Sequence, residues 1–170
     1  IRRALSKKIE KLMSLSNVVI VGNQYIAEYA IKAGAKQVEI LPTVVDTDIY
    51  IQEDYKENAN FTIGWIGSPT TSRYLNVAKP ALSQLCQNSE VQFSAIGALE
   101  KDMVEVPVQL IPWKEKTEVH ELNRFDVGIM PLPDTPWERG KCGFKLIQYM
   151  AAGLPVIASP VGVNSEIVDH

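Results

Sequence analysis

Short apolar runs rich in β-branched residues alternate with longer stretches of helical periodicity along this chain of 170 residues. Such alternation is typical of βαβ units, because parallel strands are covered on both faces and read as continuous apolar runs. Strands are expected at residues 18–21, 38–41, 61–66, 91–96, 108–111, 127–130 and 156–158. The pattern predicts an α/β fold with a doubly wound parallel sheet.

Helices are expected between these strands, at residues 24–33, 73–87, 116–123 and 144–152. The last of them ends before Gly153 and Pro155, a pair that commonly stops a helix. Residues 46–60 carry Asp, Glu, Asn and Lys without a firm period, which indicates a connector. The chain therefore divides into residues 1–45, the connector 46–60, and a main domain over residues 61–170.

The beginning of the chain has the pattern of a basic amphipathic helix over residues 1–16. Its cations are Arg2, Arg3, Lys7, Lys8 and Lys11, against a single glutamate. A helix of this kind can contact an anionic membrane surface, or it can cover the sheet and leave its lysines in water. Both interpretations stay open. No apolar run of the sequence approaches the roughly 18 residues that would indicate a membrane span.

Two loops that follow strands carry groups suited to a ligand, because open parallel sheets bind ligands at the carboxyl ends of their strands. In the first loop, Gly67 allows a ligand to approach the backbone closely, and Ser68 and Thr71 offer hydroxyl donors. Arg73 supplies a planar cation suited to phosphate. An ordinary strand-to-helix turn with a surface arginine explains the same residues equally well.

The second loop runs into a helix and combines small, cationic and amide-bearing residues: Gly140, Lys141, Gly143, Phe144, Lys145 and Gln148. The glycines leave the first amides of the helix open, and the helix dipole attracts an anion there. Lys141 and Lys145 stand one turn apart near the helix start. A solvated face is the alternative interpretation, but lysine is unusual where the dipole is positive, and a bound phosphate would explain both. Gln148 follows on the same face, where its amide can meet sugar hydroxyls.

Other ligand classes lack their signatures. Gly140 and Lys141 resemble the end of a P-loop, but Cys142 stands where that motif has Ser or Thr, and no G-x-G-x-x-G occurs after a strand. Asp46 and Asp48 have the form of a metal site but lie in the connector, so no metal site is predicted. A formal net charge of -3 argues against a nucleic-acid partner. The two cysteines suggest neither a disulfide nor zinc, which fits the cytosol.

Several motifs resemble, in order and spacing, the group 1 (family 4-like) retaining glycosyltransferases of the GT-B type, which have two Rossmann-like domains. The motifs are VVIVGN (18–23), ILPTVVD (40–46), WIGS (65–68), FDVGIMPL (125–132), QYMAAGLPVIA (148–158) and GVNSEIV (162–168). The resemblance implies that residues 1–45 are the end of an acceptor-side domain with its hinge. Residues 61–170 would be a truncated nucleotide-sugar-binding domain.

The function that this resemblance implies is transfer of a sugar from a nucleotide diphosphate sugar to a glycan or lipid-linked acceptor, with retention at the anomeric carbon. No metal or other cofactor is implied, and the place of action would be the cytoplasm, with possible peripheral contact at the inner face of the membrane. We expect residues 1–170 alone to bind nucleotide without transferring sugar. A non-catalytic nucleotide-sugar-binding module is the alternative.

The resemblance also implies roles for single residues. Arg73 and Lys145 would stabilise the charge of the leaving diphosphate. The donor-binding residues would be Gly67, Ser68, Trp113, Gly140, Lys141, Gly143, Phe144 and Gln148. For Trp113, which would lie near the base, packing in the core is an equally good interpretation. The family often carries two glutamates eight residues apart, and this sequence has Gly140 and Gln148 at those positions. Gln148 can still hydrogen-bond a ribose, and Glu138 or Lys141 would have to replace the first glutamate.

Overall fold

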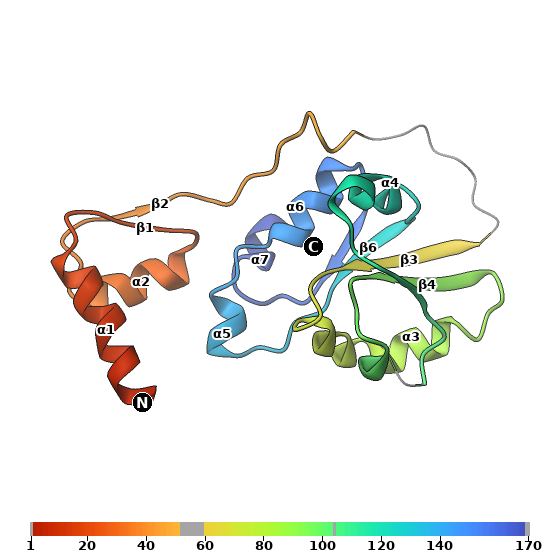
Figure 1. The fold of residues 1–170 in the computed structure, drawn as a ribbon, viewed down its shortest axis with the longest axis horizontal. Coiled ribbons are helices and arrows are strands. Elements are labelled where there is room, and N and C mark those ends of the chain that lie inside the picture. Colours follow the sequence, from red (N-terminus) through yellow and green to blue (C-terminus); the bar gives the residue numbers. More distant parts are fainter. Residues whose placement is uncertain (1, 52–59, 104, 169–170) are drawn as a thin grey trace.

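A five-stranded parallel sheet forms the core of the computed structural model, which describes residues 2–51, 60–103 and 105–168 (Figure 1). Its strands are β3 (Phe61–Ile66), β4 (Val91–Ile96), β5 (Gln109–Ile111), β6 (Val127–Met130) and β7 (Val156–Ala158). They stand in the order β5-β4-β3-β6-β7, and each neighbouring pair is parallel. The predicted α/β fold with a doubly wound parallel sheet is confirmed.

The two central strands meet at a pair of glycines. Gly64 of β3 pairs with Gly128 of β6. A β-carbon at Gly64 would lie 1.9 Å from the ring of Phe125, and one at Gly128 would lie 2.5 Å from the ring of Tyr149. The missing side chains therefore let two buried aromatic rings pack directly against the backbone of the sheet. The hydroxyl of Tyr149 accepts a hydrogen bond from the Ile66 amide at 2.9 Å, which ties helix α6 to β3.

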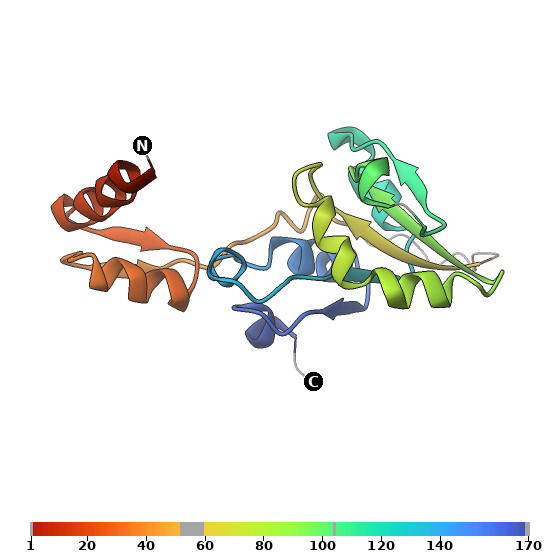
Figure 2. The same ribbon diagram turned by 90° about the horizontal axis from the view of Figure 1, so that it is seen from below.

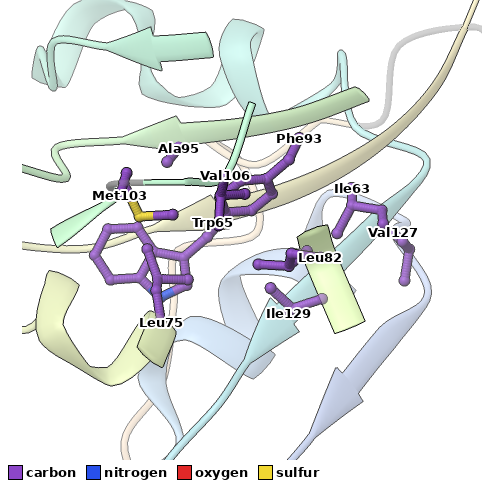
Figure 3. Packing of buried hydrophobic residues seen from close by; sticks show 10 residues of the cluster. All are labelled: Ile63, Trp65, Leu75, Leu82, Phe93, Ala95, Met103, Val106, Val127 and Ile129. Carbon is purple, nitrogen blue, oxygen red and sulfur yellow. The ribbon is translucent and has the colours of Figure 1, made fainter. Parts of the chain in front are cut away.

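Helices cover both faces of the sheet. The 3₁₀ helix η1 (Ser72–Val77) and α3 (Lys79–Leu85) lie on one face, and α4 (Glu118–Leu122) and α6 (Phe144–Ala151) lie on the other (Figure 1). The core under η1 and α3, drawn in Figure 3, consists of Ile63, Trp65, Leu75, Leu82, Phe93, Ala95, Met103, Val106, Val127 and Ile129. Under α4 and α6, Leu122, Phe125 and Tyr149 pack against the ends of the central strands.

The helices differ from the expected ones where local chemistry overrides periodicity. The helix expected over residues 73–87 is divided into η1 and α3. Pro80 explains the division, because proline lacks the amide hydrogen needed inside a helix but fits the first turn, the position it takes in α3. The helix expected over residues 116–123 begins as the 3₁₀ helix η3 (Glu115–Thr117) before α4. Three short helices were not anticipated: η2 (Glu100–Asp102), α5 (Pro136–Arg139) and α7 (Asn164–Ile167).

The N-terminal residues form a smaller lobe beside the main domain (Figure 2). It consists of α1 (Arg2–Leu15), β1 (Val19–Val21), α2 (Gln24–Lys32) and β2 (Val38–Ile40), and β1 pairs with β2 in parallel. Asn23 joins the lobe to the main domain. Its side-chain oxygen accepts from the Ile26 amide and caps α2, while its nitrogen donates to the carbonyl of Lys141 at 2.9 Å.

The predicted N-terminal helix is confirmed as α1. Lys7, Lys8 and Lys11 are exposed, and so are Ile9 and Leu12. The side chains of Arg2 and Arg3 lie outside the described part. The contact of α1 with a membrane stays a prediction. In the described part of the chain, no helix combines the length and the apolar character that a bilayer span requires.

The connector predicted over residues 46–60 begins as irregular chain, and residues 52–59 lie outside the described part. Its first residues are attached to the main domain. The hydroxyl of Tyr50 donates to Glu118 Oε1 at 2.6 Å, and Asn123 Nδ2 donates to the carbonyl of Ile51 at 3.0 Å. The boundaries assigned to the three segments stay predictions.

Candidate functional site

The order of the strands places a crevice at the carboxyl ends of β3 and β6. From β3 the chain proceeds outward through β4 to β5, and it then crosses to β6 and β7 on the other side. At such a reversal the two loops that follow the adjacent strands diverge to opposite faces of the sheet. Ligands of open α/β sheets bind in the crevice between them.

A cavity of about 620 Å³ occupies this crevice. The predicted site residues that line it are Gly67, Ser68, Trp113, Gly140, Lys141, Gly143, Phe144, Lys145 and Gln148. They come from the loops after β3, β5 and β6 and from α6. Arg73 and Glu138, which were also given roles from the sequence, do not line the cavity. Glu118 and Cys142 line it without having been singled out.

The loop after β3 approaches the helix α6 closely at Gly67. A β-carbon there would lie 2.5 Å from the Trp65 ring and 2.9 Å from Lys145 Cε, so only glycine lets the lysine stem pass. The next residues form a hydroxyl-rich turn, in which the Ser68 amide donates to Thr71 Oγ1 at 3.2 Å. The Thr71 hydroxyl in turn donates to the carbonyl of Ser68 at 3.0 Å. These bonds hold the turn in shape beside the cavity.

The start of α6 is uncapped. Gly143 holds the N-cap position with φ of 67°, in the left-handed region that favours glycine, and it offers no side-chain oxygen to the first amides. A β-carbon at Gly143 would also lie 2.3 Å from Ile167 Cδ1. The open amides at Phe144 and Lys145, together with the helix dipole, favour an anion in the cavity.

Two lysines add positive charge at this end of the cavity. Lys145 Nζ lies 5.0 Å from the centroid of the Trp65 ring, and Lys141 Nζ lies 5.2 Å from that of Tyr74. Neither lysine forms an ion pair with a described residue. Burial, and secondarily the nearby Lys141, lower the pKa of Lys145 from 10.5 to about 8. An anion that entered the cavity would relieve both effects.

A hydrogen-bonded group of side chains lies at another part of the cavity wall. Gln148 Nε2 donates to the hydroxyl of Tyr50 at 2.8 Å and to Glu118 Oε1 at 2.9 Å. Trp113 Nε1 donates to Glu118 Oε2. Glu118 was missed by sequence reasoning because it stands in a polar helix with other glutamates, where nothing local distinguishes it.

Arg73 lies at a neighbouring hollow of about 530 Å³, which Tyr74, Trp137 and Glu138 also line. Its guanidinium carbon stands 5.3 Å from the centroid of the Tyr74 ring. Lys141, which lines the main cavity, stands 5.2 Å from the same centroid, so the Tyr74 ring lies between the hollow of Arg73 and the main cavity. The contact of Arg73 with a donor stays a prediction.

Glu138, the proposed replacement for the first family glutamate, lines the same hollow as Arg73. It is buried, and it accepts hydrogen bonds from the hydroxyls of Tyr74 and Thr135. Burial raises the pKa of this carboxyl, but these two hydrogen bonds and the charge of Lys141 outweigh it, so the pKa lies below its ordinary value. Of the two suggested replacements, only Lys141 lines the main cavity.

The described residues offer little for a metal. Among them no group of three or more His, Cys, Asp or Glu side chains is arranged to hold an ion. Asp46 and Asp48 do not line the cavity, and the Asp48 amide donates to Asp46 Oδ1 at 2.9 Å in a local turn. The expectation that no metal is required stays a prediction.

Comparison with known proteins gives a family and a set of similar folds. The model of the family described as "Glycosyl transferases group 1" matches residues 60–170. No curated protein matches the sequence at a significant level. The family match covers the whole sheet and every residue of the cavity wall.

Solved structures with a similar fold include Anabaena HepE in complex with UDP and glucose, with a TM-score of 0.75, 15% identity, and coverage of 100% of this chain and 53% of that chain. A TarM variant of S. aureus in complex with UDP has a TM-score of 0.67 at 15% identity, with coverage of 96% of this chain and 34% of that chain. A UDP-forming trehalose-phosphate synthase of Burkholderia xenovorans has a TM-score of 0.65 at 13% identity, with coverage of 94% of this chain and 50% of that chain. At these identities the likeness shows the fold alone, and the chain spans between about a third and a half of these proteins.

Proposed function

The chain belongs to the group 1 glycosyl transferases, and from this premise we propose that its main domain binds a nucleotide diphosphate sugar in the cavity at the ends of β3 and β6. The observation that carries the proposal is the pair Lys141 and Lys145, which form no ion pair with a described residue and stand beside the uncapped start of α6. Two cations without an ion pair and free helix amides suit a diphosphate. The solved complexes of HepE and TarM with UDP support the same class of ligand.

In this proposal the protein contributes chiefly electrostatic stabilisation. Negative charge accumulates on the diphosphate as the bond to the sugar breaks, and Lys145, Lys141 and the first amides of α6 are positioned to stabilise it. The sugar passes to a glycan or lipid-linked acceptor with retention at the anomeric carbon. Because the lysines supply the positive charge, the transfer requires no metal. The retention and the acceptor class rest on the family resemblance.

A second candidate function is binding without catalysis. It is favoured by the absence of a carboxylate at position 140 and by the location of Glu138, which lies at the neighbouring hollow rather than at the cavity. Sugar transfer by a longer polypeptide that contains both lobes would exclude this candidate. Persistent binding of an intact nucleotide sugar without turnover would support it.

Titration with UDP, GDP and ADP tests the proposed ligand class. At least one of them should bind saturably to residues 1–170 and raise the melting temperature, because binding to the folded state stabilises it by mass action. EDTA should leave the affinity unchanged within about twofold, since Lys145 and the α6 amides replace a bridging cation. If none of the three binds, the proposal is wrong. A strict magnesium requirement would overturn the claim that no metal is needed.

The affinity for the nucleoside diphosphate should fall as the pH rises. Because the pKa of Lys145 is about 8 in the empty cavity, the lysine is mostly charged at pH 7 and mostly neutral at pH 9. The diphosphate binds the charged form, so binding at pH 9 must include uptake of a proton. We expect the affinity to fall about tenfold between pH 7 and pH 9, because the charged fraction of a group with a pKa of about 8 falls by that factor.

Calorimetric titration at pH 7 and pH 9, in buffers of different ionisation enthalpy, measures both the affinity and the proton uptake. Lys145→Arg provides the control, because arginine stays charged over this range. Its affinity should be independent of pH. Equal affinities of the native chain at the two pH values would contradict the assignment of Lys145 to the diphosphate.

A further inference from the structure

The cavity contains one carboxylate that the proposed function does not yet use. Among the described residues that line the cavity, Glu118 is the only acidic one. It comes from α4, whereas Gln148, Lys145 and the free amides come from α6. A carboxylate in a cavity built for an anion requires an explanation, because it repels the phosphate groups that the lysines attract.

The hydrogen bonds fix how the Gln148 amide is oriented. Its nitrogen has two hydrogens, and both are used, toward the hydroxyl of Tyr50 and toward Glu118 Oε1. The side-chain oxygen of Gln148 therefore points away from these partners, and it accepts no hydrogen bond from a described residue. Because Gln148 lines the cavity, this oxygen is an acceptor available to a ligand.

Glu118 offers a second acceptor beside the first. Its Oε1 receives hydrogen bonds from Tyr50 and Gln148, which uses both acceptor positions of that oxygen. Its Oε2 receives one, from Trp113 Nε1, and keeps one position free. Burial, and then the hydrogen bond to Glu118, raise the pKa of Tyr50 to about 12, so its hydroxyl stays protonated and continues to hold the carboxylate in place.

Two acceptors on neighbouring residues of one cavity wall suit a ligand with two neighbouring donors, such as the vicinal hydroxyls of a ribose. Trp113, half of whose surface is exposed at 51%, adds a flat apolar face next to them. A nucleoside diphosphate presents a base, a vicinal diol and an anion in that order. The cavity wall offers an indole, a pair of acceptors and a pair of lysines.

We propose that Glu118 accepts a hydrogen bond from a ribose hydroxyl of the donor nucleotide, beside the ribose contact that the family resemblance already implies for Gln148. In this arrangement α4 supplies the carboxylate that α6 lacks at position 148, and Tyr50 orients it. The inference rests on the proposed function, since it names a further contact of the same ligand. It makes Glu118 a determinant of the preference for ribonucleotides.

The test compares a ribonucleoside diphosphate with its 2′,3′-dideoxy form, using whichever of UDP, GDP and ADP binds. Hydrogen bonds to a charged acceptor are strong, so the native chain should bind the ribo form about 10- to 100-fold more tightly. Glu118→Ala should weaken the ribo form about tenfold or more and leave the dideoxy form within about twofold. A merely structural role for Glu118 would weaken both ligands equally, and that result would overturn the proposal.

An exchange of the two residues sharpens the test. Glu118→Gln keeps the shape of the side chain and should lose most of the preference for the ribo form. The double variant Glu118→Gln with Gln148→Glu moves the carboxylate to α6, on the same cavity wall. It should restore the preference for the ribo form. Failure of the double variant to restore it, with an unchanged melting temperature, would contradict the assignment.

The outcomes separate this inference from the proposed function. If the native chain binds neither form of any of the three nucleotides, the proposed function is wrong and the inference falls with it. If it binds the ribo and dideoxy forms equally, and Lys145→Ala weakens both, then the diphosphate site stands and only the role of Glu118 is wrong.

Discussion

Lys145→Ala is expected to weaken the binding of a nucleoside diphosphate by about 10- to 100-fold, because a charge-assisted hydrogen bond contributes about 1.5–3 kcal/mol. The side chain begins at the open end of α6, passes over Gly67, and carries its charge in the cavity without an acidic partner among the described residues. Its removal leaves the diphosphate with Lys141 and the helix amides.

The matching nucleoside provides the contrast. It has no phosphate, so its affinity should change by less than about twofold in Lys145→Ala, the range of an ordinary surface substitution. Calorimetric titration of both proteins with both ligands gives the four affinities. Equal losses for the two ligands would point to misfolding, and no loss for either would mean that Lys145 does not contact the donor.

The same substitution should change how the stability of the empty domain depends on pH. The pKa of Lys145 is lowered from 10.5 to about 8 in the folded chain, so between these values the unfolded chain binds more protons. The free energy of unfolding therefore rises with pH between about 8 and 10.5. Below pH 8 the folded chain carries a buried positive charge on Lys145, which lowers its stability. Lys145→Ala should remove this rise.

Gly97→Ala is expected to lower the free energy of unfolding by about 2–5 kcal/mol, and nucleotide binding should fail with it. Gly97 has φ of 74°, and a β-carbon there would lie 2.2 Å from the carbonyl oxygen of Gly67. The atom that it would strike belongs to the backbone of the loop that lines the cavity. The amide of Gly97 also donates to the carbonyl of Ile111 at 2.9 Å, which joins the loop after β4 to the end of β5.

Gly153→Ala is a matched control for this substitution. Gly153 also has φ of 74°, but it is exposed at the end of α6. Alanine there should cost only the conformational part, about 1–2 kcal/mol. Denaturant unfolding of both variants measures the difference. If Gly97→Ala and Gly153→Ala lower the free energy of unfolding equally, the close approach of Gly97 to the Gly67 carbonyl does not contribute to the loss.

The fold was largely predictable because its information is local. All the expected strands that build the main sheet are present, and the observed bounds differ from the expected ones only at the start of β5. Apolar β-branched runs that are buried on both faces leave few alternatives. The division of residues 73–87 was missed because proline at a first turn was weighed less than the apolar period.

The candidate site was predictable where it depends on one segment. The glycines, lysines and glutamine of residues 140–148 come from a single loop and helix, and their joint location follows from the pattern. Glu118 and Tyr50 reach Gln148 from 30 and 98 residues away, and only tertiary packing brings them together. Arg73 stays a predicted donor contact that lines a neighbouring hollow, and it shares the ring of Tyr74 with Lys141, a contact that only tertiary packing creates.

The loop that contains Lys141 contacts both the N-terminal lobe, through the hydrogen bond from Asn23, and the cavity. The loop that supplies Lys141 to the cavity also holds the N-terminal lobe, where Cys142 packs against Gly22 so closely that a β-carbon on Gly22 would lie 2.3 Å from its sulfur. Any change in free energy that a docked lobe makes to the affinity for nucleotide is matched by an equal change that nucleotide makes to docking. Asn23 holds the carbonyl of the same residue whose side chain lines the cavity, so a substitution at Asn23 that weakens docking of the lobe is expected to change the affinity for nucleotide by the same factor as nucleotide changes docking.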